Sequence, residues 1–123
     1  MNSPSPETDF LVGWTTTETR EQALRLAHLA VEQRLAACAQ INGPLASVYS
    51  WKQSLHEDEE WRLTLKFPAS TADDLAALLV AEHPYDVHQW ITCRAEGIHP
   101  PYAEWIADQT GPEAPSSSNP DPS

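Results

Sequence analysis

The chain has 123 residues, a formal net charge of −11 and only seven Lys and Arg residues. A chain of this length can build one domain with one modest core. The basic residues are dispersed and the overall field is negative, which argues against nucleic acid and anionic membranes as partners. No long apolar run is present and no apolar block lies near Met1, so the sequence predicts a cytoplasmic protein without a membrane span.

Both ends of the chain offer little that a core could bury. Residues 1–8 and 110–123 are rich in Pro, Ser and Asn, and we expect both segments to be disordered. Residues 9–109 should then form a single folded domain. The two cysteines, Cys38 and Cys93, show no zinc-binding spacing and are expected to be free thiols in a reducing compartment.

The first predicted elements are a strand and a helix. Residues 9–16 alternate loosely between apolar and polar side chains, as a strand does. Residues 19–22 have the form of a capping box, with Thr17 as a competing N-cap, and predict a helix start. The next small residues lie on one stripe at helical spacing, which predicts a helix packed closely on a sheet: Ala23, Ala27, Ala30 and Val31.

Two extended segments follow. Residues 36–51 form the first, which must bulge or break at Asn42-Gly43-Pro44 because proline has no amide hydrogen for a sheet ladder. The charged run at residues 56–60 is expected to form a turn. Residues 61–67 then alternate strictly between apolar and polar side chains, which predicts a strand with one buried face.

The last third of the chain predicts helix, strand and helix. Pro68 should end the third strand, and Ser70 or Thr71 should cap a helix that stops at His83-Pro84. Residues 87–95 read as the fourth strand. Pro100-Pro101 should begin a short final helix, with three side chains facing inward: Tyr102, Trp105 and Ile106.

This order of elements predicts an α+β fold, the ferredoxin-like βαββαβ sandwich with a short C-terminal helix. The first and third strands should lie in the middle, with the fourth beside the first and the second beside the third. Chain direction then brings residues 15–17, 52–57 and 83–87 to one end of the sheet. Cys38, Lys66 and Cys93 should share the other end.

The two outer strands of such a sheet have no partner within one chain. The second strand is long and carries the aromatic side chains Tyr49 and Trp51. An exposed edge of this kind invites aggregation unless another chain covers it. The sequence therefore predicts an oligomer of identical chains.

Four segments, in this order and spacing, resemble the CutA family: Arg34–Ile41, Ser47–Lys52, Glu82–Val87 and Tyr102–Ile106. The resemblance runs from about residue 9 to residue 107. It implies a ferredoxin-like homotrimer held by strand pairing between subunits, similar in architecture to the PII signalling proteins. The family is named for tolerance to divalent cations, copper in particular, so copper or another divalent cation is the implied ligand.

The chain departs from the family pattern at three places. Gln53-Ser54 stands where relatives usually have Gly-Lys, and His88 stands where they usually have Pro. Trp14 occupies a position where some members carry a cysteine that is a proposed metal ligand. This last difference weakens a direct transfer of copper binding to this chain.

Cys38 and His83 are the candidate metal ligands. A thiolate with a nearby imidazole suits copper or zinc, although a free cysteine between two alanines is more often a small buried residue. His83 could instead have a structural role, because a positively charged side chain stabilises the C-terminus of the helix that precedes it. The acidic run at residues 57–60 is better read as a solvated hairpin tip than as a metal site.

Candidate ligand-binding residues are Lys66, His83, Tyr85 and Trp51. Tyr85 and Trp51 could stack on a ligand in a cleft between subunits, or pack the subunit interface itself. Lys66 could bind an anion or pair with Glu96. No catalytic motif is present, so a binding protein for metal ions or small ligands is predicted rather than an enzyme. The alternative is a trimeric scaffold that binds a protein partner.

Overall fold

The computed structural model describes residues 9–112, and this part of the chain forms a four-stranded sheet with three α-helices and one 3-10 turn. The elements follow the predicted order: β1 (Phe10–Thr17), α1 (Arg20–Glu32), β2 (Cys38–Trp51), β3 (Ser54–Pro68), η2 (Ala69–Thr71), α2 (Ala72–Glu82), β4 (Ile91–Arg94) and α3 (Pro100–Gln109). Residues 1–8 and 113–123, where we predicted disorder, lie outside the described residues.

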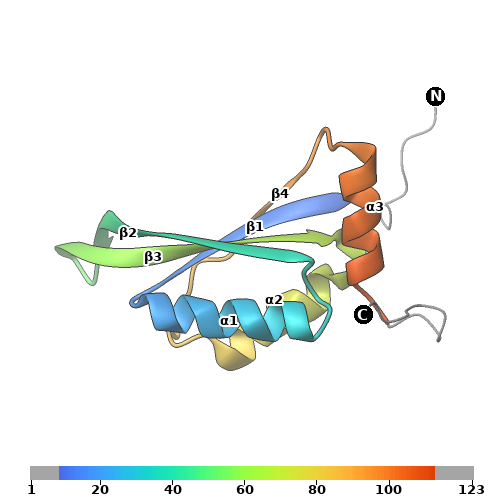
Figure 1. Cartoon of the computed structure of the whole chain (residues 1–123). Helices are drawn as coiled ribbons and strands as arrows, with labels where there is room; N and C mark the ends of the chain where they lie inside the picture. The colour runs from blue at the N-terminus through green and yellow to red at the C-terminus, as the bar shows by residue number, and fades with distance from the viewer. Residues whose placement is uncertain (1–8, 113–123) are drawn as a thin grey trace.

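The sheet has the strand order β2-β3-β1-β4, and each neighbouring pair is antiparallel. The first and third strands are therefore central, as predicted. Helices α1 and α2 cover one face of the sheet, and α3 stands at one end of it (Figure 1). At the other end, the β2–β3 hairpin reaches past the helices (Figure 1).

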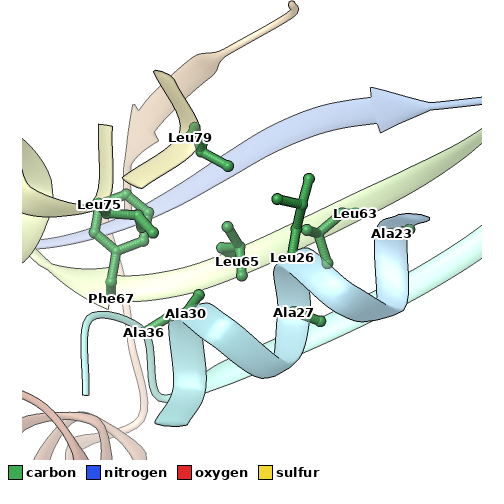
Figure 2. Close-up of a cluster of buried hydrophobic side chains, with 10 residues drawn as sticks. All are labelled: Ala23, Leu26, Ala27, Ala30, Ala36, Leu63, Leu65, Phe67, Leu75 and Leu79. Carbon is green, nitrogen blue, oxygen red and sulfur yellow. The ribbon is translucent and has the colours of Figure 1, made fainter. Parts of the chain in front are cut away.

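The core lies between the two helices and the covered face of the sheet (Figure 2). Ala23, Ala27 and Ala30 of the predicted stripe of α1 are buried and let the helix approach the sheet closely, whereas Val31, predicted in the same stripe, is 39% exposed because it lies at the edge of this face. The opposing side chains of β3 are fully buried, because alternate residues of a strand point to the same face: Leu63, Leu65 and Phe67. Each such side chain stabilises the fold by about 1.5–3 kcal/mol.

Helix α1 begins at the predicted capping box. The hydroxyl oxygen of Thr19 accepts a hydrogen bond from the Gln22 amide at 3.1 Å, and the Gln22 side chain accepts one from the Thr19 amide at 3.2 Å. Thr17, the competing N-cap, donates its hydroxyl to the Thr19 carbonyl instead. Thr71 is the N-cap of α2, but its hydroxyl donates to the Leu35 carbonyl at 2.7 Å rather than capping the helix.

The predicted charged turn at residues 56–60 is wrong, because these residues belong to β3. The chain turns at Lys52 and Gln53, whose φ values of 52° and 68° suit the two central positions of a tight hairpin turn. These charged side chains lie on a hairpin that extends away from the core. The polarity of the run therefore indicates exposed strand residues and not a turn. The predicted bulge is confirmed: the β2–β3 register shifts between Asn42 and Leu45.

The fourth strand is shorter than predicted, since only Ile91–Arg94 pairs with β1. The preceding residues instead fold around the imidazole of His83. The Tyr85 amide donates to Nδ1 of His83 at 3.0 Å, and His88 stacks on the same ring with centroids 4.6 Å apart. Backbone used in this compact turn cannot extend the ladder with β1.

The C-terminal helix packs through Ile106, which is buried as predicted. Trp105 was also expected to face inward, but it is 41% exposed and stacks on Tyr102. Arg34 holds the C-terminal end of this helix. Its guanidinium donates hydrogen bonds to the carbonyl of Asp108 at 2.8 Å and to that of Gly111 at 2.7 Å. Within residues 9–112, no helix is long and apolar enough to cross a bilayer.

Candidate functional site

A wide groove of about 1220 Å³ lies where the β2–β3 hairpin meets the end of β1 and the segment after α2. We call it the hairpin groove, and the residues that define it here are Thr16, Glu18, Tyr49, Trp51, Lys52, Asp58, Glu59, Glu60, Tyr85 and Asp86. Residues 15–17, 52–57 and 83–87, which were predicted to share this end of the sheet, all contribute residues to the groove. The prediction that these three segments lie together is therefore confirmed.

Tyr85 lies on the wall of the groove and crosses to the third strand. Its hydroxyl donates a hydrogen bond to Oε2 of Glu60 at 2.9 Å. Burial raises the pKa of the Tyr85 phenol, and the hydrogen bond to Glu60 and the negative charge of that carboxylate raise it further. Tyr85 thus stays a neutral donor at physiological pH and fixes the direction of the carboxylate.

A second tyrosine–carboxylate pair lies further out on the hairpin. The hydroxyl of Tyr49 donates to Oδ2 of Asp58, and the Tyr49 ring stacks on His56 with centroids 5.3 Å apart. The hydrogen bond to Asp58 is the main cause that raises the pKa of Tyr49. Trp51 follows on the same strand near the turn, where it is 47% exposed.

His83 is held from both sides of its ring. Nδ1 accepts from the Tyr85 amide at 3.0 Å, so Nε2 carries the proton and donates to Oγ1 of the buried Thr15 at 2.9 Å. Burial, and next the charge of His88, lower the pKa of His83 to about 4. The imidazole is therefore neutral at pH 7 and does not act as a cation at the end of α2. Its two nitrogens are both engaged, and ligation of a metal would require it to leave one partner.

Cys38 and Lys66 lie away from the hairpin groove, in one row across the sheet with Val12 and Cys93. The Lys66 ammonium lies 5.8 Å from the centroid of the Tyr102 ring of α3, a cation–π contact. No ion pair joins Lys66 to an acidic residue such as Glu96 within residues 9–112. Cys38 is half-buried and Cys93 is exposed, and both are free thiols.

The candidate residues thus fall into two groups. Trp51 and Tyr85 line the hairpin groove, with His83 positioning the segment that carries Tyr85. Cys38 and Lys66 lie at the other end of the sheet. A single chain does not bring Cys38 and His83 together.

Three residues that form hydrogen bonds within the groove were not named as candidate ligand-binding residues from the sequence: Tyr49, Asp58 and Glu60. A signal for them existed, since Tyr49 alternates with Trp51 on one strand face. Asp58 and Glu60 fall within the acidic run that was assigned to a turn, so their position opposite β2 was lost.

The donor set of residues 9–112 in one chain does not fit a bound metal ion. In the part of the chain that the structure describes, no three His, Cys, Asp or Glu side chains lie close enough to hold one. Cys38 has Lys66, and no further metal-binding residue, as its partner in the β2–β3 register. Metal binding by these residues would need a further copy of the chain.

Comparison with known proteins gives a consistent match. The family model described as CutA1 divalent ion tolerance protein matches residues 11–109. The divalent-cation tolerance protein CutA of Thermus thermophilus is 32% identical over 96 residues, which cover 78% of this chain and 93% of that protein. Protein CutA of Mus musculus is 32% identical over 97 residues, which cover 79% of this chain and 55% of that protein.

The chain spans between 55% and 65% of the length of the first animal and plant relatives that it matches. Two of these plant relatives are named as chloroplastic. Among solved structures, CutA1 from Oryza sativa has a TM-score of 0.82 at 32% identity, covering 87% of this chain and 98% of that one. The Cut A1 protein of Thermus thermophilus has a TM-score of 0.80 at 31% identity, covering 83% and 99%.

Proposed function

Because the chain belongs to the CutA1 divalent ion tolerance family, we propose that it is a homotrimeric binding protein that serves tolerance to divalent metal ions, copper in particular, or the sensing of a small ligand. In this proposal the hairpin groove lies at the subunit boundary and forms the cleft for a small ligand, whereas a metal ion binds at the end of the sheet that carries Cys38. The trimer has ferredoxin-like subunits and works in the cytoplasm. It is a binding protein and not an enzyme.

The exposed hairpin is the observation that carries this proposal. Strand β2 is an outer strand of the sheet, and its projecting half carries Val48 at 63% and Trp51 at 47% exposure. Leu55, directly after the turn, is 79% exposed. A long apolar edge is an aggregation hazard in a monomer, whereas cyclic pairing with two further copies covers it in each subunit.

Metal binding in this proposal depends on the trimer. Cys38 supplies a soft sulfur ligand, which suits copper, and the remaining ligands come from a neighbouring copy. His83 takes part only if its Nε2–H gives up the hydrogen bond to Thr15. The proposal therefore separates two events, assembly of the trimer and capture of the ion.

A copper titration by calorimetry tests the metal half of the proposal. We expect saturable Cu⁺ binding to the reduced full chain, at least about tenfold weaker in Cys38→Ser because the soft ligand is lost. Cys93→Ser is the matched control, since Cys93 is also a free thiol in the same row of the sheet but is exposed. Light scattering on the same samples should report three times the chain mass of 13.7 kDa. Equal isotherms for wild type and Cys38→Ser would remove Cys38 from the site.

A further inference from the structure

Helix α3 is held at its C-terminal end by one residue from a distant part of the chain, Arg34. The guanidinium donates to the carbonyls of Asp108 at 2.8 Å, Thr110 at 3.4 Å and Gly111 at 2.7 Å. In return, the Arg34 carbonyl accepts a hydrogen bond from the Gly111 amide at 2.9 Å. The last carbonyls of a helix lack partners within it, and a cation there is favourable. The connection between α1 and β2 therefore caps α3 (Figure 1).

The backbone of Arg34 is in a conformation that disfavours an arginine. Its φ of 60° lies in the left-handed region, which glycine adopts most readily. A glycine at this position would relieve the strain, but it would offer no guanidinium to the end of α3. The contacts with α3 thus offset the backbone strain at Arg34.

The first turn of α3 contacts the sheet at a second point. The Lys66 ammonium lies 5.8 Å from the centroid of the Tyr102 ring. Lys66 is the register partner of Cys38, and Arg34 lies in the segment that leads into Cys38. The two contact points of α3 are therefore the strand neighbour of Cys38 and the turn that precedes it. Cys38 is half-buried, whereas Cys93, in the same row but on the other outer strand, is exposed.

We propose that α3 is a strap over the Cys38 end of the sheet, pinned by Arg34, and that release of this strap controls access to the Cys38 thiol. Within α3 only Ile106 is buried, so few apolar contacts hold the helix besides its two ends. Elements with few buried contacts open most readily. The inference rests on the proposed function, because Cys38 is the metal ligand proposed there, and it adds a means of regulating that site.

The rate at which iodoacetamide labels each cysteine of the reduced, metal-free full chain tests this proposal, with peptide mapping as the readout. Arg34→Asn removes the guanidinium, and asparagine tolerates the left-handed backbone. We expect Cys38 to be labelled at least about tenfold faster in this variant, because charge-assisted hydrogen bonds are the strong ones. Loss of a nearby positive charge disfavours the reactive thiolate, so a faster reaction reports better access. Tyr102→Leu removes the other contact and should also accelerate the labelling of Cys38.

The exposed Cys93 is the internal reference and should keep its labelling rate in both variants. Arg25→Gln is the matched control, since it removes a guanidinium that pairs with Glu82 of α2 and not with α3. An unchanged Cys38 rate in both Arg34→Asn and Tyr102→Leu, or an equal rise in Arg25→Gln, would overturn the proposal. Because no copper is present in this assay, its failure contradicts only the strap, whereas absent copper binding in the calorimetry contradicts the metal half of the proposed function.

Discussion

At the scale of single residues, His83 has a structural role that its position before a proline only partly indicates. The ring accepts from the Tyr85 amide, donates to Thr15 and stacks on His88. These contacts shape the turn that brings Tyr85 to the groove. The imidazole performs this role only in its neutral form, because a proton on Nδ1 would remove the acceptor for the amide.

The stability of the fold should therefore depend on His83 in mildly acidic solution. Its pKa is lowered from 6.5 to about 4 in the folded chain. Between these values the unfolded chain binds more protons than the folded one, so the free energy of unfolding rises with pH across this window and falls as the pH drops from 6.5 towards 4. Urea unfolding at several pH values should show that His83→Gln loses part of this slope, while His99→Gln, an exposed histidine before α3, keeps it. An unchanged slope in His83→Gln would contradict the assignment.

At the scale of secondary-structure elements, the start of α1 depends on local side-chain contacts. Thr19 and Gln22 satisfy each other's backbone amides in the capping box. Thr19→Ala should reduce the free energy of unfolding by about 0.5–2 kcal/mol, since the Gln22 amide loses its acceptor. Ser70→Ala is the matched control: Ser70 precedes α2, is exposed and is not the N-cap. Urea denaturation of both variants measures the difference, and equal losses would show that the capping box adds nothing.

The elements that could be predicted from the sequence are those whose signals are local. The capping box at residues 19–22 and the alternation at residues 61–67 each lie within a few residues, and both predicted their elements correctly. The turn at Lys52 and Gln53 lies within the segment 52–57 that was predicted as the hairpin tip, but the charges of residues 56–60 resemble a loop and moved the predicted start of the third strand to residue 61. The fourth strand was extended too far because the compact turn around His83 was not recognised; it includes local contacts with Tyr85 and His88 and a bond to Thr15, 68 residues away.

The groove could be predicted only in outline for the same reason. Strand order placed Trp51 and Tyr85 at one end of the sheet, and the structure confirms this. The partners of the tyrosines depend on the hairpin register, which the sequence did not reveal. Asp58 and Glu60 became visible as groove residues only once β3 was known to begin at Ser54.

At the scale of the whole molecule, the projecting hairpin leaves apolar side chains exposed that the proposed trimer would cover. The hairpin extends beyond the layer of helices, so its apolar side chains have no core of their own chain to enter (Figure 1). A cyclic assembly would place the same side chains in three equivalent contacts. In the proposed trimer, a substitution in the hairpin would therefore alter three contacts.

Leu55→Asp tests whether these contacts hold the trimer. Leu55 is 79% exposed in the single chain, so the change should leave the fold of the subunit intact. In the proposed trimer the residue is buried, and losing it costs about 1.5–3 kcal/mol per contact, besides the cost of burying a charge. Light scattering over a dilution series should show dissociation at concentrations at least about tenfold higher than for the wild type. Val80→Asp is the matched control, because Val80 is 74% exposed on α2, away from the hairpin. A stable trimer in Leu55→Asp, or dissociation in Val80→Asp alone, would place the subunit interface on another surface.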